Sequence, residues 1–324
     1  MANEEYFVLE GGDRMPRIGF GTWQATDEEL EKAVESALEA GYRHIDAAPV
    51  YENEKALGRA LKKWIGANPS RRKELFIVTK LPPGGNRPDL VQECFDASLR
   101  DLGLEYIDMY LIHTPFAFEH VPGDFHPKNP DGSMRVDHTT DLIAVWKAVL
   151  KLKESGKVRH VGVSNLNEEQ LKRITSVAKP ACLQVEVHLL CQQKELVATA
   201  TKLGIPVVAY SPLGSKGLAD ALSAKTGREY PDLLQLPAVL RIAERHARTP
   251  AQVLLRHALQ RGIAAIPKST NPQRIKQNIS LWDFALTEEE MAELSAMDRG
   301  EDGRICDFSF FIGIDKHPEF PFKK

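Results

Sequence analysis

The stretch GYRHIDAAPVYENEKALG, residues 41–58, joins two kinds of secondary structure across a short break. Residues 43–46 predict a strand that ends in the carboxylate of Asp46, the Ala-Ala-Pro that follows interrupts it, and Tyr51 opens a predicted helix. An acid at the end of a buried strand is costly unless it is paired. This stretch therefore predicts one strand-to-helix unit and requires a partner for Asp46 elsewhere in the chain.

The same succession of strand and helix recurs along the whole sequence. Short apolar runs predict eight strands, at 18–21, 43–46, 76–80, 107–113, 160–164, 183–187, 207–210 and 263–267. Amphipathic stretches predict helices at 27–40, 52–65, 88–102, 140–154, 167–176, 192–203, a double stretch over 236–260, and then 272–279 and 287–297. Strands that alternate with helices predict right-handed βαβ units and a parallel sheet.

Eight such units in one domain, residues 1–324, favour a (β/α)₈ barrel. A doubly wound sheet also fits the alternation, but it needs a glycine fingerprint after the first strand, and Gly19-Phe20-Gly21 continues as Thr-Trp-Gln. Residues 6–17 precede the first strand and predict a hairpin that plugs the barrel floor. Long connections are expected at 114–139, 211–235 and 298–324 on the face where barrel enzymes act.

Composition narrows the classes of partner. The chain is 43% hydrophobic, with a net charge of −3 and a pI of about 6.4, so nucleic-acid binding has no support. It contains no run of apolar residues long enough to span a membrane, and its acidic first residues do not predict a signal peptide. The four cysteines lie far apart, which is typical of free thiols, and we expect a cytoplasmic protein.

Polar residues mark the carboxyl end of each predicted strand, which is the pattern expected of a barrel with one active site. In strand order they are Thr22 and Trp23, Asp46, Lys80, His113, Ser164 and Asn165, Gln184 and Glu186, Tyr210 and Ser211, and Lys268 and Ser269.

These residue types favour proton donation to an alkoxide. No metal-binding pair of the H-x-H or H-E-x-x-H type occurs, and G-x-S-x-G is absent. Asp46 and Glu186 could serve a glycosidase, but Lys80 and Tyr51 would then have no function. Carbonyl reduction uses all of them: an ammonium at Lys80 favours the phenolate of Tyr51, Asp46 pairs with Lys80, and His113 hydrogen-bonds the substrate carbonyl.

The chain resembles the aldo-keto reductase family over nearly its full length. The resemblance rests on MPRIGFGTW, GYRHIDAAPVYENEKALG, FIVTKL, LRDLGLEYIDMYLIH, GKVRHVGVSN, VVAYSPLG, IPKSTNPQRIKQN and HPEFPF. It implies a (β/α)₈ barrel, a monomer, reduction of aldehydes and ketones with NADPH, and the catalytic tetrad Asp46, Tyr51, Lys80 and His113. A short-chain dehydrogenase would carry its Tyr-x-x-x-Lys pair behind a glycine-rich turn, so we interpret Lys55 as a solvated helix residue.

The resemblance also implies a binding site for NADP(H). Tyr210 would stack on the nicotinamide, and Ser164, Asn165 and Gln184 would hold its carboxamide. The remaining expected cofactor contacts are Thr22, Trp23, Ser211, Leu213 and Ser215, with Lys268, Ser269 and Arg274 at the 2′-phosphate and Gln277 and Asn278 at the adenine. Two cations and a hydroxyl suit a dianionic phosphate.

The substrate site is expected at Trp23, Tyr51, His113 and Thr114. Pro82 and Thr114 stand where relatives often have tryptophan, which predicts a bulkier or more flexible carbonyl substrate. Phenylalanines of the long loops would compensate: Phe116, Phe118, Phe125, Phe308, Phe310 and Phe311. Cys306 is interpreted as a passive thiol. Two other classes stay open from sequence: a non-catalytic NADPH-binding protein and a barrel hydrolase.

Overall fold

The computed structural model describes residues 5–322, and in this range eight parallel strands form one sheet in chain order. They are β3 (Phe20–Gly21), β4 (His44–Asp46), β5 (Phe76–Leu81), β6 (Ile107–Ile112), β7 (Val158–Ser164), β8 (Leu183–Glu186), β9 (Val207–Tyr210) and β10 (Ala264–Ala265). The amides of Gly19 and Gly21 donate to the carbonyls of Ala265 and Pro267, which joins the first strand to the last. The sheet is therefore a closed (β/α)₈ barrel, as predicted.

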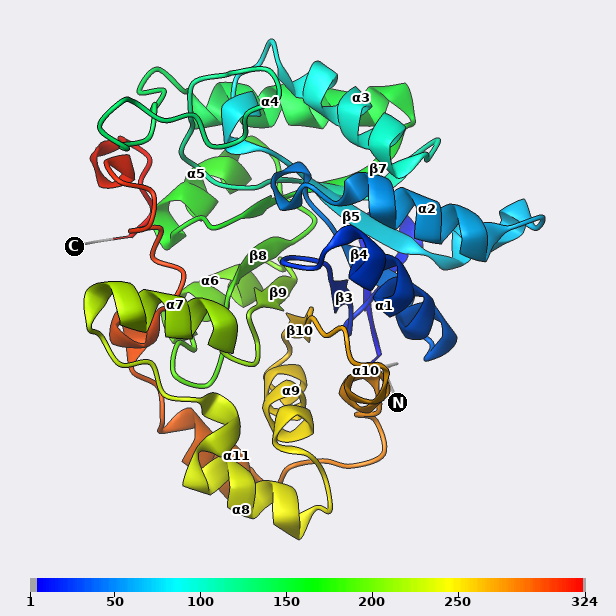
Figure 1. Ribbon diagram of the computed structural model, residues 1–324, viewed down its shortest axis with the longest axis vertical. Helices are drawn as coiled ribbons and strands as arrows, with labels where there is room; N and C mark the ends of the chain where they lie inside the picture. Colours follow the sequence, from blue (N-terminus) through cyan, green and yellow to red (C-terminus); the bar gives the residue numbers. More distant parts are fainter. Residues whose placement is uncertain (1–4, 323–324) are drawn as a thin grey trace.

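Helices surround the strands (Figure 1). Those of the barrel layer are α1 (Asp27–Glu39), α2 (Glu54–Ile65), α3 (Val91–Leu102), α4 (Leu142–Leu152), α5 (Glu168–Val177), α6 (Lys194–Lys202), α9 (Pro250–Gln260) and α10 (Pro272–Ile279). Three more lie outside it: α7 (Lys216–Thr226), α8 (Pro237–Arg245) and α11 (Glu288–Ser295). Helix α10 packs against α1 and α9, so it completes the ring, whereas α8 packs against α9 and α11.

One predicted connection is wrong. Residues 211–235 were expected to lack secondary structure, but they contain α7. This helix buries only Ala219 and Leu222, so it shows almost none of the apolar periodicity from which a helix is recognised in sequence. The other long segments, 114–139 and the described part of the tail, contain no α-helix. Short 3₁₀ turns lie at Glu10–Gly12, Pro49–Tyr51, Pro69–Glu74, Pro83–Gly85, Lys153–Ser155, Leu233–Gln235, Gly300–Gly303 and Ile314–Lys316.

The N-terminal hairpin closes the floor of the barrel, as predicted. Strands β1 (Tyr6–Val8) and β2 (Arg14–Pro16) pair antiparallel. Leu9 and Met15 are buried against Phe76 and other residues of the barrel interior. Phe76 is the first residue of β5, so the hairpin covers the amino ends of the strands and leaves the carboxyl ends open. Within residues 5–322 no helix has the length and apolar character of a membrane span.

Candidate active site

A cavity of about 640 Å³ opens at the carboxyl ends of the barrel strands. Most of the site residues predicted from sequence line it: Thr22, Trp23, Asp46, Tyr51, His113, Thr114, Ser164, Asn165, Gln184, Tyr210, Ser211, Leu213, Ser215 and Lys268. Lys80 lies behind this wall. Ser269, Arg274, Gln277 and Asn278 do not line the cavity; they belong to the segment after β10 and to α10.

Asp46, Lys80 and Tyr51 form a connected group at the cavity wall, with Lys80 behind the other two. The Lys80 Nζ donates to Asp46 Oδ1 at 2.6 Å, to the Ala47 carbonyl at 2.8 Å and to Tyr51 Oη at 3.1 Å. Lys80 has no exposed side-chain surface, and Asp46 has only 2%. Asp46 Oδ2 also accepts from Gln184 Nε2 at 2.7 Å. The buried strand-end acid therefore has the partner that the sequence required.

Burial and neighbouring charge act against each other in this group. Burial by itself lowers the pKa of Lys80, but the Asp46 carboxylate and the Tyr51 oxygen raise it above its usual value, so Lys80 is an ammonium. Burial raises the pKa of the Tyr51 phenol, and the Lys80 ammonium opposes that rise. Tyr51 is therefore protonated at neutral pH, and a phenolate formed there has a cation 3.1 Å away.

His113 faces Tyr51 across the cavity wall, with the ring centroids 5.8 Å apart and nearly perpendicular. Burial, and after it the Lys80 ammonium and His126, lower the pKa of His113 well below its ordinary value. Its imidazole is thus neutral at physiological pH. A neutral imidazole has one N–H, and can donate one hydrogen bond to an oxygen in the cavity.

The backbone after β4 aims Tyr51 at the cavity. Tyr51 ends the 3₁₀ turn Pro49–Tyr51, and Glu52 then takes a left-handed conformation with φ of 55°. The side-chain amide of Asn53 donates to the backbone carbonyls of Thr22 and Ala25 at 2.9 and 3.2 Å, which fixes the start of α2. Lys55 is exposed on that helix, so the Tyr-x-x-x-Lys spacing does not form a catalytic pair here.

Side chains from β7, β8 and β9 hold one another at the next part of the wall. Asn165, with φ of 60°, donates to the His113 carbonyl at 2.9 Å and accepts from the Tyr210 hydroxyl at 2.7 Å. The Ser164 hydroxyl donates to the Gln184 carbonyl at 2.8 Å. Amide groups and an aromatic face thus stand next to the tetrad, and this donor set fits a nicotinamide with its carboxamide.

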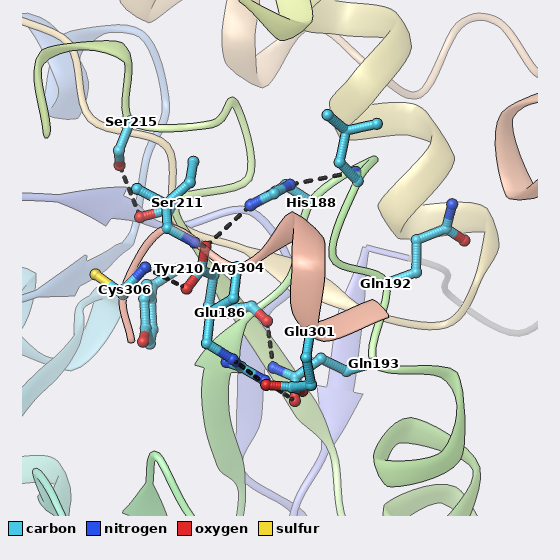
Figure 2. Close-up of polar contacts among 12 residues, drawn as sticks. Glu186, His188, Gln192, Gln193, Tyr210, Ser211, Ser215, Glu301, Arg304 and Cys306 are labelled. Atoms are coloured by element: carbon cyan, nitrogen blue, oxygen red, sulfur yellow. Dashed lines mark hydrogen bonds and ion pairs between the residues drawn. The ribbon is translucent and has the colours of Figure 1, made fainter. Parts of the chain in front are cut away.

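Beyond Tyr210, the cavity wall presents hydroxyl groups and then a lysine. Ser215 donates to the Ser211 hydroxyl at 2.7 Å (Figure 2), and both residues have positive φ. Lys268, which donates to the Gln24 carbonyl, has its pKa lowered by burial and by the nearby Arg274 guanidinium, while Glu29 opposes both. Two cations near each other suit an anionic group, and this fits the phosphates of a dinucleotide.

Sequence reasoning missed several cavity residues. Val50, Pro83, Pro212 and His126 also line it. Of the loop phenylalanines, Phe308, Phe310 and Phe311 line the cavity, whereas Phe116 and Phe118 are buried behind them and Phe125 is not part of the wall. Cys306 lines the cavity, and burial raises the pKa of its thiol well above the ordinary value.

Glu186 does not line the cavity, so within residues 5–322 the cavity wall offers a glycosidase no second carboxylate beside Asp46. Both Glu186 oxygens accept backbone amides of the C-terminal segment instead. Residues 5–322 also contain no cluster of three or more His, Cys, Asp or Glu that could hold a metal ion.

Comparison with known proteins gives one consistent result. The sequence profile described as "Aldo/keto reductase family" matches residues 17–299. Aldo-keto reductase family 1 member A1 of Mus musculus is 44% identical over 295 residues, which is 90% of this chain and 89% of the relative. The Gallus gallus protein of the same name is 42% identical over 298 residues, covering 91% and 89%. The aldose reductase structure from Schistosoma japonicum superposes with a TM-score of 0.88 and 38% identity over 99% of both chains. The chain therefore belongs to the aldo/keto reductase family.

Proposed function

We propose that this protein reduces aldehydes and ketones to alcohols with NADPH, and that Tyr51 is the general acid. The observation that carries the proposal is the chain of contacts from Asp46 through Lys80 to Tyr51, which ends with a phenol on the wall of the cavity. The cofactor, when bound, supplies a hydride to the carbonyl carbon. The residues of the chain then have to manage the charge that develops on the carbonyl oxygen.

Tyr51 donates its phenolic proton to that oxygen. The Lys80 ammonium, 3.1 Å from the phenol oxygen, stabilises the phenolate that remains. Asp46 keeps Lys80 charged and fixes its position. His113, neutral because burial and the Lys80 ammonium lower its pKa, donates a hydrogen bond that orients the carbonyl.

For NADP(H), we propose that Tyr210 stacks on the nicotinamide ring and that Ser164, Asn165 and Gln184 hold its carboxamide. Thr22, Trp23, Ser211, Leu213 and Ser215 line the middle of the cofactor site. Lys268, Ser269 and Arg274 bind the 2′-phosphate, and Gln277 and Asn278 contact the adenine. The two adjacent cations at Lys268 and Arg274 favour NADPH over NADH, because an extra phosphate provides a partner for both.

The substrate contacts in this proposal are Trp23, Tyr51, His113 and Thr114, with a small-molecule carbonyl as the partner. We also infer a single domain over residues 1–324 that acts as a cytoplasmic monomer, in line with the family. Size-exclusion chromatography with light scattering tests the monomer.

Tyr51→Phe tests the acid directly. We expect turnover of an aldehyde, followed by NADPH absorbance, to fall by about 10²-fold or more, which is the usual scale of general acid catalysis. The Kd of NADPH, measured by fluorescence titration, should stay within about twofold. Tyr42→Phe is the matched control, since Tyr42 is buried away from the cavity with its hydroxyl on the Ile275 carbonyl. Equal losses of turnover and NADPH affinity in Tyr51→Phe would show that the acid is misassigned.

A further inference from the structure

The C-terminal segment forms part of the cavity wall with little secondary structure of its own. Between Arg299 and Phe322 it contains only the two 3₁₀ turns Gly300–Gly303 and Ile314–Lys316. Cys306, Phe308, Phe310 and Phe311 nevertheless line the cavity. Contacts to the rest of the protein must therefore determine where these side chains stand.

Glu186, the last residue of β8, makes the inner contact. Its Oε1 accepts from the Ile305 amide at 2.8 Å, and its Oε2 accepts from the Cys306 amide, also at 2.8 Å. The side chain is completely buried. Figure 2 shows the carboxylate of Glu186 between the strand and the tail. Two adjacent backbone amides are thus fixed by one carboxylate.

Surrounding groups keep that carboxylate ionised. Burial raises the pKa of Glu186, but the hydrogen bond from His188, the charge of Arg304 and the Ile305 amide together lower it below its ordinary value. His188 Nδ1 accepts the Leu190 amide at 3.3 Å, so the Nε2 carries the proton that is donated to Glu186 at 2.9 Å. A charged acceptor makes stronger hydrogen bonds than a neutral one.

Further contacts align the tail with the loop after β8. Arg304 is almost completely buried, pairs with Glu301 and donates to Gln193 Oε1 at 3.2 Å (Figure 2). Its guanidinium also lies over the Phe322 ring, 4.0 Å from the ring centroid. Gly303 lies so close to the Leu190 carbonyl that a Cβ would stand 1.7 Å from its oxygen. Position 303 therefore requires glycine in this conformation.

The outer part of the tail is held by a different region. The Ile312 carbonyl accepts the Met134 amide at 2.9 Å, and His317 bonds the Asp137 carbonyl at 2.9 Å. Glu319 pairs with Arg173 on α5 at 2.8 Å. Residues 307–311 therefore form an arch between an inner anchor at Glu186 and an outer anchor on the 114–139 loop and α5.

We propose that Glu186 is a positioning residue that determines substrate specificity, because its carboxylate sets where the arch stands against the cavity. The inference rests on the proposed carbonyl reduction. Large carbonyl compounds that reach Phe308 and its neighbours depend on Glu186, whereas small ones that fit beside Tyr51 and His113 do not. Glu186 itself touches neither the cavity nor the reacting atoms.

The test compares Glu186→Gln with the wild type on propanal and on 2-naphthaldehyde. A glutamine has one side-chain oxygen for the two backbone amides of Ile305 and Cys306, and its NH₂ faces one of these donors. One hydrogen bond is therefore lost, and residues 307–311 move relative to the cavity. We expect the KM for 2-naphthaldehyde to rise about tenfold or more. The KM for propanal, both kcat values and the Kd of NADPH should stay within about threefold. Glu186→Asp keeps the charge but shortens the reach, and the same selective rise is expected, so the test survives if the glutamine variant fails to fold.

Glu290→Gln is the matched control. Glu290 is likewise buried and bonded to a histidine and a backbone amide, through His246 and Thr287, and it also pairs with Arg245, but it belongs to α11 away from the cavity. It should lower the thermal midpoint without separating the two substrates. Parallel KM changes for both aldehydes in the Glu186 variants, or no change, would overturn the inference. A wild-type protein that reduces neither aldehyde would refute the proposed function instead.

Discussion

Replacing Lys80 with methionine removes the buried cation next to Tyr51 while keeping the approximate volume of the side chain. The Lys80 Nζ lies 3.1 Å from the Tyr51 oxygen. At an effective dielectric constant of about 20, a unit charge pair at this distance is worth about 5 kcal/mol. If the phenolate forms in the transition state, losing this attraction slows proton transfer by up to about 10⁴-fold, since each 1.4 kcal/mol is a factor of about ten.

The assay is single-turnover oxidation of bound NADPH by an aldehyde, followed by stopped-flow absorbance so that product release does not mask the chemical step. We expect a rate lower by about 10²- to 10⁴-fold. The methionine also leaves Asp46 without its ammonium, so the double variant Asp46→Asn/Lys80→Met is measured beside it to remove both charges. Circular dichroism checks that each variant is folded.

Lys55→Met is the second control. Lys55 is the exposed lysine that completes the Tyr-x-x-x-Lys spacing with Tyr51, and its loss should change the rate by less than about twofold. A Lys80→Met rate within about tenfold of the wild type would refute the reasoning, because a buried ammonium at hydrogen-bond distance could not then be contributing to catalysis.

Three further predictions concern the cofactor, pH and packing. Lys268→Ala or Arg274→Ala should raise the Kd of NADPH about 10- to 100-fold and leave that of NADH nearly unchanged by fluorescence titration; parallel weakening would contradict the 2′-phosphate assignment. Burial raises the pKa of Glu54 to about 7, so its contribution to the free energy of unfolding is complete below about pH 4.5 and is lost as the pH rises through about 7. Glu54→Gln should therefore flatten the pH dependence of the urea midpoint between pH 5 and 8, and an unaltered slope would refute this. Gly58→Ala places a Cβ 2.7 Å from carbonyl oxygens of α3 and should cost about 1–3 kcal/mol of stability, whereas Gly217→Ala, in open space, should cost nothing measurable by urea unfolding.

The barrel could be predicted because its strands are short, apolar and regularly separated by amphipathic helices. Helix starts at Asn167 and Thr287 were also readable, since each has a Gln or Glu three residues later, and both form reciprocal capping boxes. The start of α2 was placed two residues early, because Glu52 takes a left-handed conformation that its residue type does not indicate. The small buried face of α7 left almost no apolar periodicity in the sequence.

The tetrad residues could be located because parallel strands in a barrel place all their carboxyl ends on one rim. The side chains from long segments could not. Phe311 lines the cavity and also packs on Phe118, with the ring centroids 5.1 Å apart, and these residues lie on segments far apart in the chain. His126, which also lines the cavity, belongs to the same 114–139 loop as Phe118. No local sequence pattern predicts contacts of this kind. For the same reason, the sequence did not indicate that the Glu186 carboxylate bonds the C-terminal segment and does not line the cavity.

The hairpin at the amino ends of the strands has a consequence for engineering the molecule. Leu9 and Met15 are buried at that end, whereas the cavity lined by Tyr51 and His113 lies at the opposite ends of the strands. Cross-links or stabilising substitutions in the hairpin can raise the temperature of unfolding without changing the residues that line the cavity. The amino ends of the strands can thus be redesigned for stability, and the carboxyl ends for substrate specificity, independently of each other.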